Sequence, residues 1–305
     1  MKALIVGLGS IASKHIQVLR EIEPNVLIYA LRSSPNQDSE KGLFNVYEWD
    51  ALKEHDFDFA IISSPSSLHL EHIVRLNSFN IPLMIEKPLL INMLQVKQLE
   101  KINLNNSIMY VACNLRFHPL VLFIAEYLKK SPSKINEVNS YFGSHLPSWR
   151  PNRDYRKIYS SISSLGGGVH LDLIHEPDYL VYLFGLPRTV KTEKRKVSNL
   201  EIDSYDTAIS LFQYEDFQAS IVLNYYRKDT KRTLEIIREK DTLLVDFNSN
   251  EVRNLIDNTV LFKNPELSIL TTYRKQMHYF LDCIKHNNKP MNSPQEAIEI
   301  LKCIL

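Results

Sequence analysis

The chain has 305 residues, of which 44% are hydrophobic and 23% charged, so it is long enough for two globular domains. Its net charge of +1 gives no sign of a nucleic-acid or acidic membrane partner, and no apolar run approaches the roughly 20 residues that span a bilayer. Three widely spaced cysteines exclude a disulfide framework and predict a reducing, cytoplasmic location, and the break of the first apolar run at Gly7 excludes a signal peptide.

The chain opens on a pattern typical of dinucleotide binding. An apolar run over residues 3–6 predicts a buried strand, and Gly7-Leu8-Gly9-Ser10-Ile11-Ala12 follows it as a helical pattern begins. This is the G-x-G-x-x-A fingerprint, in which Gly7 permits the turn, Gly9 lets the backbone approach a pyrophosphate and Ala12 keeps the helix near the strand. The helix N-terminus, at Ser10, Ile11 and Ala12, offers N–H groups to phosphates. The alternative is a plain glycine turn.

Strands and helices then alternate, which predicts a parallel, doubly wound sheet. The expected strands are 26–31, 59–62, 82–85 and 107–111, and the expected helices are 68–79 and 93–102. Ligands of such sheets bind outside the carboxyl ends of the strands. Those ends carry mostly polar residues: Gly7, Arg32, Ser63-Ser64-Pro65, Glu86-Lys87 and Asn114-Leu115-Arg116.

The end of the second strand bears on the choice of cofactor. NAD-preferring sites usually place an acidic residue there to hold the ribose 2′-OH. Here Arg32, Ser33 and Ser34 stand in its place, and an arginine with two hydroxyls suits a 2′-phosphate. NADP is therefore favoured, with the alternative that Arg32 stacks on the adenine and NAD also fits.

Glu86-Lys87-Pro88 ends the strand over residues 82–85. Proline has no N–H and restricts the residue before it, so the strand must stop there, and the Lys87–Pro88 bond could be cis. A lysine at this edge of the sheet would face the cofactor crevice. The alternative is an ordinary solvated turn.

After Pro119 the alternation stops and a strand-rich part follows, so we expect a Rossmann domain over residues 1–119 and an α+β domain with an open, mostly antiparallel sheet over 120–305. The expected strands are 135–142, 188–196, 204–212, 217–225, 232–237 and 242–246, and the expected helices are 120–129, 273–286 and 294–305. The last helices have the option of packing back on the first domain. The cleft between the two domains is the default site.

A glycine run, Gly166-Gly167-Gly168, precedes a helical pattern in which Asp172, His175, Glu176 and Tyr179 fall within an arc of about 100°. Such a titratable face is a candidate for proton transfer, whereas the alternative is a solvated face. Pro177 within the run indicates a kink or a helix that begins nearby. His170 lies far round the wheel, so we predict no metal site here.

Two loop-like segments, residues 114–119 and 148–156, combine arginines with aromatic rings. Arginine forks bind carboxylates or phosphates, and a ring can stack on a sugar face. Arg116 and Arg150 are therefore candidates to bind an anionic part of a substrate. The alternative is a pair of surface loops with scattered charges.

The motifs in order resemble the Gfo/Idh/MocA oxidoreductases. The resemblance is carried over the whole chain by Gly7 to Ala12, Pro65-Ser66-Ser67-Leu68-His69, Glu86-Lys87-Pro88, and the glycine run that leads to His175-Glu176-Pro177-Asp178. It implies a Rossmann domain and a second sheet domain that binds substrate and forms homodimers or homotetramers. Residues 149–155, 172–176 and 232–243 are similar to a branch associated with surface-polysaccharide and nonulosonate sugars.

The resemblance also implies roles for residues. Lys87 matches the lysine that binds the substrate hydroxyl and the cofactor, and His175 matches the general acid/base. Asp172 matches the family aspartate but stands three residues before His175, where many members have four. The predicted cofactor contacts are Gly7, Gly9, Ser10, Ile11, Ala12, Arg32, Ser33, Ser34, Ser64, Pro65, His69, Glu86, Lys87 and Asn114. The predicted substrate contacts are Lys87, Arg116, Trp149, Arg150, Tyr155, Asp172 and His175.

The expected reaction is hydride transfer between NADP or NAD and a sugar carbinol. Two other functions stay open. One is a lyase or hydrolase that uses bound NAD transiently, with no net redox change. The other is a dinucleotide-binding sensor without catalysis, against which the joint presence of Lys87, Asp172 and His175 argues.

Overall fold

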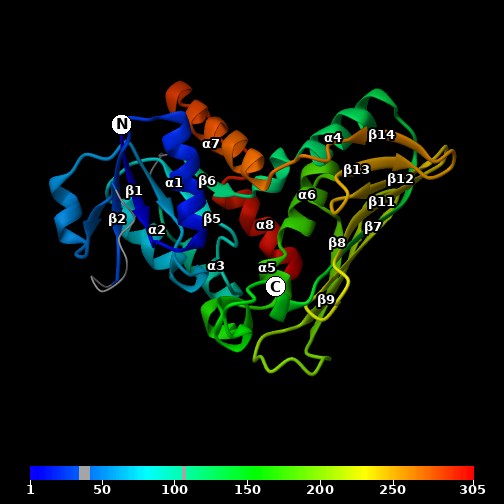
Figure 1. Ribbon diagram of the computed structural model, residues 1–305, viewed down its shortest axis with the longest axis horizontal. Coiled ribbons are helices and arrows are strands. Elements are labelled where there is room, and N and C mark those ends of the chain that lie inside the picture. The colour runs from blue at the N-terminus through cyan, green and yellow to red at the C-terminus, as the bar shows by residue number, and fades with distance from the viewer. Residues whose placement is uncertain (34–41, 105–107) are drawn as a thin grey trace. The chain divides into compact units, whose positions relative to one another are not determined.

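A computed structural model of the chain describes residues 1–33, 42–104 and 108–305 (Figure 1). The chain divides into two compact units, Met1–Asn114 with Ile269–Ile298, and Leu115–Ser268 with Glu299–Leu305. The first unit thus takes a helix from a distant part of the chain. The predicted domain boundary at residue 119 stays a prediction.

The first unit contains a parallel sheet whose strands, within the described residues, follow the order β3-β2-β1-β4-β5-β6. The strands are β1 (Lys2–Val6), β2 (Leu27–Leu31), β3 (Phe44–Val46), β4 (Phe59–Ile62), β5 (Leu83–Glu86) and β6 (Met109–Ala112). In β1, β4, β5 and β6 nearly every residue is buried, as expected for strands covered on both faces. The predicted Rossmann sheet is therefore confirmed. The three-residue strand β3 was not predicted, because it is too short to show a periodic pattern.

The helices of the first unit are amphipathic. They are α1 (Ser10–Ile22), α2 (His69–Asn77), α3 (Met93–Leu99), α7 (Ile269–His286) and the first part of α8 (Pro294–Ile304). Ala12, Ile16 and Leu19 form the buried stripe of α1. Helices α1 and α7 lie side by side (Figure 1), and Arg274 of α7 pairs with Glu21 of α1. Helix α7, from the last part of the chain, therefore packs on the helix that follows the glycine fingerprint.

The second unit contains a sheet whose order is β14-β13-β12-β11-β7-β10-β9-β8 in the described part of the chain. Its strands are β7 (Ile135–Gly143), β8 (Thr189–Arg195), β9 (Thr207–Gln213), β10 (Gln218–Asn224), β11 (Lys231–Arg238), β12 (Thr242–Asp246), β13 (Glu251–Asn254) and β14 (Thr259–Lys263). Strands β7 and β10 pair in parallel, whereas the other described pairs are antiparallel. This confirms the predicted fold class. The hairpin of β13 and β14 was not predicted.

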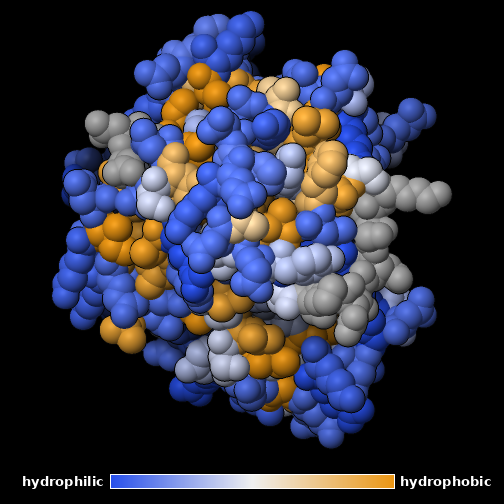
Figure 2. Space-filling model, turned by 90° about the vertical axis from the view of Figure 1, so that its left-hand side faces the viewer, coloured by the Kyte–Doolittle hydropathy of each residue, from blue (hydrophilic) through white to orange (hydrophobic). Residues whose placement is uncertain are grey.

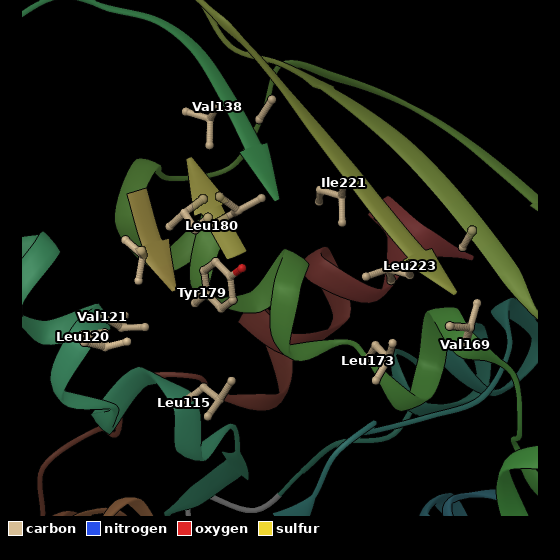
Figure 3. Packing of buried hydrophobic residues seen from close by; sticks show 14 of the residues in the cluster. Leu115, Leu120, Val121, Val138, Val169, Leu173, Tyr179, Leu180, Ile221 and Leu223 are labelled. Atoms are coloured by element: carbon tan, nitrogen blue, oxygen red, sulfur yellow. The ribbon is translucent and has the colours of Figure 1, made fainter. Parts of the chain in front are cut away.

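Helices α4 (Pro119–Lys130), α5 (Val169–Asp172) and α6 (His175–Phe184) lie on one face of this sheet (Figure 1). The core of the unit forms where α6 meets the sheet (Figure 3). Tyr179 and Leu180 of α6 pack with Val138 of β7 and Ile221 of β10, and all four are at most 1% exposed. Each fully buried side chain of this size contributes about 1.5–3 kcal/mol, so α6 is held firmly on the sheet.

The surface shows no continuous apolar band in the view of Figure 2, where separate hydrophobic patches alternate with hydrophilic side chains. Among the described residues, no helix combines the length and the hydropathy that crossing a bilayer requires.

Candidate active site

A cavity of about 390 Å³ lies at the carboxyl ends of β1, β2 and β4 in the first unit. Gly7 is at its base, with φ of +89°, and a Cβ there would lie 2.6 Å from Cα of Ser64. The chain can therefore make this close approach only with glycine. A Cβ on Gly9 would meet nothing within 4 Å, so the loop leaves open space above it. Ser64 and Pro65, both predicted cofactor contacts, also line the cavity.

The N-terminus of α1 follows the glycine loop. Gly9 occupies the N-cap position and makes no side-chain cap bond, so the first-turn N–H groups of Ser10, Ile11 and Ala12 have no such partner. The helix dipole adds a partial positive charge there. The loop and the helix end fit the pyrophosphate of a dinucleotide.

Arg32 and Ser33 line the same cavity at the end of β2. Arg32 is buried, and its Nη1 donates to Oδ1 of Asn45 at 3.3 Å, whereas Ser33 is exposed. No acidic side chain is among the described residues that line the cavity. Ser34, the third predicted residue, lies outside the described residues.

The cavity also contains residues that sequence reasoning missed. Tyr47 and Trp49 follow the unpredicted strand β3, and Leu68 and His72 come from the segment after β4. Nδ1 of His72 is 2.8 Å from Oγ of Ser64, and burial lowers the pKa of His72 to about 4. The ring of His72 is therefore neutral near pH 7. In the sequence, only the positions of these four residues in segments that follow strands could have indicated that they line the cavity. Such a position is weak evidence of a binding role for an aromatic side chain.

Lys87 follows the last residue of β5 and is partly exposed, and the Lys87–Pro88 bond is cis. The preceding Glu86 does not line the cavity. Its buried carboxylate lies 2.6 Å from Nε2 of His15 and accepts a hydrogen bond of 3.2 Å from the backbone N–H of Lys87. Glu86 thus has an internal partner, and its contact with the cofactor stays a prediction.

Two other predicted cofactor residues are also internal. His69 is fully buried, and its ring nitrogens lie 2.9 Å from the carbonyl oxygen of Pro88 and 3.0 Å from that of Ser64. Asn114 is buried and donates to Oγ1 of Thr272 at 2.6 Å. Neither lines the cavity, because each side chain points into the first unit and is held by neighbours there.

The helical face predicted for the second unit is broken. Helix α5 ends at Asp172 and α6 begins at His175, so the two side chains do not belong to one continuous helix. Pro177 sits in the first turn of α6, where its missing N–H costs nothing. The prediction that a helix begins near Pro177 is confirmed, and the single polar arc is wrong.

The glycine run before α5 is crowded. A Cβ on Gly167 would collide with the carbonyl oxygen of Tyr159 and would lie 2.6 Å from that of Ser160. Asp172 is buried, and its Oδ2 accepts a hydrogen bond of 2.5 Å from the hydroxyl of Tyr225, which is 53 residues away in the sequence. His175 is partly exposed. Tyr225 was not identified as a site residue from the sequence, because only the folded second unit brings it next to Asp172.

The other members of the predicted polar face turn into the second unit. Glu176 is fully buried and pairs with Nε of Arg232 at 2.6 Å, while the hydroxyl of Tyr179 bonds Oγ of Ser140 at 2.8 Å. These contacts tie α6 to β11 and β7. The sequence pattern had placed both residues on a titratable face that is a candidate for proton transfer. In the structure both side chains are instead buried in contacts within the second unit.

The predicted anion-binding residues differ in their surroundings. The guanidinium of Arg116 is buried and bonds both carboxylate oxygens of Asp178 at 2.8–3.1 Å, so its contact with substrate stays a prediction. Trp149 packs edge-on against Tyr225, with ring centroids 5.3 Å apart, and its Nε1 donates to Ser144.

Arg150 is exposed. Tyr155 is partly exposed and accepts a hydrogen bond of 3.3 Å from the N–H of Glu201. Within the described residues, no group of three or more His, Cys, Asp or Glu side chains could hold a metal ion.

Comparisons with known proteins agree with this geometry. Residues 1–111 match the model of the Gfo/Idh/MocA family, an oxidoreductase family with an NAD-binding Rossmann fold. No curated protein matches the chain. The first 111 residues are thus similar to the Rossmann domain of the Gfo/Idh/MocA oxidoreductases, which supports the resemblance that the motifs predicted.

Solved structures extend the likeness to the whole chain. Levoglucosan dehydrogenase in complex with NADH has a TM-score of 0.86 at 15% identity, covering 100% of this chain and 95% of that one. Myo-inositol 2-dehydrogenase from Lactobacillus plantarum has a TM-score of 0.79 at 18% identity, covering 99% and 94%. The WlbA dehydrogenase from Bordetella pertussis, in complex with NADH and UDP-GlcNAcA, has a TM-score of 0.81 at 15% identity, covering 99% and 92%. At these identities the likeness establishes the fold.

Proposed function

We propose that this protein is an NAD(P)-dependent dehydrogenase or reductase that acts on a carbinol or ketone of a sugar or sugar derivative. The observation that carries the proposal is the carboxyl edge of the Rossmann sheet. A cavity at the ends of β2, β1 and β4 contains the glycine loop, which leads to the N-terminus of α1. The next strand, β5, is followed by the partly exposed Lys87, beside the buried Glu86. Sugar dehydrogenases among the solved structures of this fold support the substrate class.

A bound nicotinamide would accept or supply the hydride. In the oxidation direction, His175 takes the proton of the substrate hydroxyl as the C–H electron pair leaves. The Lys87 ammonium stabilises the negative charge that develops on that oxygen. Asp172, held by Tyr225, orients or charge-balances these groups. Trp149 and Tyr155 offer aromatic faces, and Arg150 an exposed guanidinium, to the remainder of the substrate.

Two single variants test these roles. Lys87→Ala and His175→Ala should each lower turnover by about 10²–10⁴-fold, the usual contribution of a positioned acid/base or electrostatic group. Cofactor binding, followed by quenching of tryptophan fluorescence, should survive because Trp49 reports on a cavity that neither residue lines. Full turnover in either variant would remove that residue from the proposed mechanism.

We further propose a preference for NADP, supported by Arg32 and Ser33 in the cavity at the end of β2 and by the absence of an acidic side chain among its described lining. Solved relatives include proteins with NADH or NAD+ and one described as NADPH-dependent. Arg32→Gln should weaken NADPH binding by about tenfold, because it removes a charged hydrogen bond to the 2′-phosphate. NADH binding should weaken by less, because NADH has no such phosphate. Equal losses for both cofactors would place Arg32 against the adenine instead.

The setting we propose is surface-polysaccharide or nonulosonate metabolism in the cytoplasm, with a homodimer or homotetramer formed through the second sheet. A panel of nucleotide sugars and acidic sugars, screened with each cofactor by thermal shift, would identify the ligand class. A lyase or hydrolase with transient use of NAD remains the second candidate, and it would show no net change in nicotinamide absorbance.

A further inference from the structure

Two buried histidines in the first unit contact the residues on either side of Lys87. His15 lies on α1, the helix that follows the glycine loop, and contacts Glu86. His69 lies at the start of α2, just after the Ser63-Ser64-Pro65 segment, and contacts Pro88. Both histidines are 0% exposed, and neither lines the cofactor cavity.

The contact of His15 is well defined. Its Nε2 lies 2.6 Å from Oε1 of Glu86, while Oε2 of the same carboxylate accepts the backbone N–H of Lys87. Nδ1 of His15 is buried and has no hydrogen-bond partner among the described residues. Because a carboxylate only accepts hydrogen bonds, Nε2 of His15 carries the proton of this contact. Tyr273 of α7 packs edge-on against this ring, with centroids 5.4 Å apart, and fixes its plane.

His69 spans the other side. Its Nδ1 is 2.9 Å from the carbonyl oxygen of Pro88, and its Nε2 is 3.0 Å from that of Ser64. Ser64 lines the cofactor cavity and touches the turn at Gly7. Complete burial lowers the pKa of His69, so the neutral ring donates to one carbonyl at a time. The ring therefore joins the cavity wall directly to the peptide that follows Lys87.

We propose that His15 and His69 are positioning residues for Lys87, each linking one cofactor-binding segment to one neighbour of the lysine. The glycine-loop helix holds Glu86 through His15, and the Ser64 segment holds Pro88 through His69. A dinucleotide that orders these two segments thereby also sets the place of the Lys87 ammonium. The inference rests on the proposed role of Lys87 beside the cofactor, and it adds two residues that touch neither cofactor nor substrate.

A purely structural role would predict a different outcome. If the histidines only stabilised the unit, their loss would lower the melting temperature and leave Lys87 unchanged in the protein that remains folded. If they served the cavity itself, their loss would weaken cofactor binding. The proposal instead predicts that cofactor binding is kept while the response of Lys87 to the cofactor is lost.

The test uses an NMR signal of Lys87 and needs no substrate. Lysines of the full chain are reductively methylated with ¹³C, and the Lys87 dimethylamino signal is assigned by its absence in Lys87→Arg. The signal is recorded with and without saturating NADH or NADPH. The variants are His15→Phe and His69→Phe, which keep a ring and remove its nitrogens, and His69→Gln, whose side-chain amide keeps a hydrogen-bond donor. Tyr110→Phe is the matched control, because it removes a buried hydrogen bond of 3.2 Å to Gln276 in the same unit.

In the wild type and in Tyr110→Phe, the Lys87 signal should shift when cofactor binds. In the two phenylalanine variants that shift should fall by at least about half, while the Kd for NADH stays within about threefold. His69→Gln should recover part of the shift and serves where His69→Phe does not fold. Once a substrate is known, kcat should fall with an unchanged KM for cofactor.

Three results would overturn the proposal. A shift of wild-type size in folded His15→Phe and in either His69 variant would show that the histidines do not position Lys87. A large loss of NADH affinity in those variants would place their effect at the cavity. If the Lys87 signal of the wild type does not shift with either NADH or NADPH, the proposed role of Lys87 itself is contradicted. Failure to find a sugar substrate affects only the proposed function, because this readout does not depend on turnover.

Discussion

Two regions rich in titratable side chains, one in each unit of this protein, share the same arrangement in different structural settings. At the end of β5 in the first unit, Glu86 and its partner His15 are buried behind Lys87, which is partly exposed. At the break between α5 and α6 in the second unit, Glu176 forms a buried ion pair with the sheet and leaves His175 partly exposed. Each region thus combines buried, paired groups with one accessible candidate. The comparison shows that pairing within the fold, and not the number of titratable residues, separates structural groups from candidates for chemistry.

The largest stability effect is expected at the buried pair of the second region. Glu176→Ala leaves the Arg232 guanidinium largely buried without its carboxylate, and breaking such a pair costs about 3–5 kcal/mol. Urea unfolding measures this loss. The exposed pair of Arg188 and Glu215 gives the control, since Glu215→Ala should cost about 0–1 kcal/mol. Similar costs for the two variants would end the distinction between structural and accessible groups.

A smaller effect on stability and a specific one on turnover are expected for Tyr225→Phe. The variant removes the hydroxyl that donates to Asp172, a buried hydrogen bond whose loss costs about 1–3 kcal/mol. Because Asp172 then lacks the hydrogen bond from Tyr225 that helps to fix its carboxylate, turnover should fall by about 10–100-fold with cofactor affinity unchanged. Tyr179→Phe is the control, since its hydroxyl bonds Ser140 in the core and should affect stability alone. Equal turnover in the two variants would deny Asp172 its role.

The smallest effect is a pH dependence of stability that arises in both regions. Burial lowers the pKa of His72 in the first unit to about 4 and that of His170 in the second to about 3. In the unfolded chain a histidine takes up a proton near pH 6.5, whereas the two buried rings of the folded protein take one up only at lower pH. The free energy of unfolding should therefore fall as the pH drops from about 6.5 toward 4. Urea titrations at several pH values should show a shallower slope in His72→Gln and His170→Gln. An unchanged slope in both would show that neither ring is buried as neutral imidazole.

The two regions also differ in how far the sequence could predict them. In the first unit, the glycine fingerprint, the strand ends and Lys87 follow from local patterns, because a parallel sheet places the ends of its strands at one edge. His15 could not be identified, since nothing local pairs position 15 with position 86. In the second unit, the helix wheel assumed one helix where the chain has a break. The partners of its residues are distant in sequence: Tyr225 follows β10 directly, and Arg232 lies on β11. Local periodicity predicts elements, whereas contacts across a sheet need the fold.

The fate of a deuterium label tests the central claim most directly. The wild-type protein is incubated with NADPH or NADH carrying deuterium at C4 of the nicotinamide and with each keto-sugar of the panel. The account predicts that one substrate is reduced to a carbinol that carries the deuterium, with one equivalent of reduced nicotinamide consumed. A product that forms while the nicotinamide absorbance stays constant and the label stays on the cofactor would contradict it and favour a lyase or hydrolase.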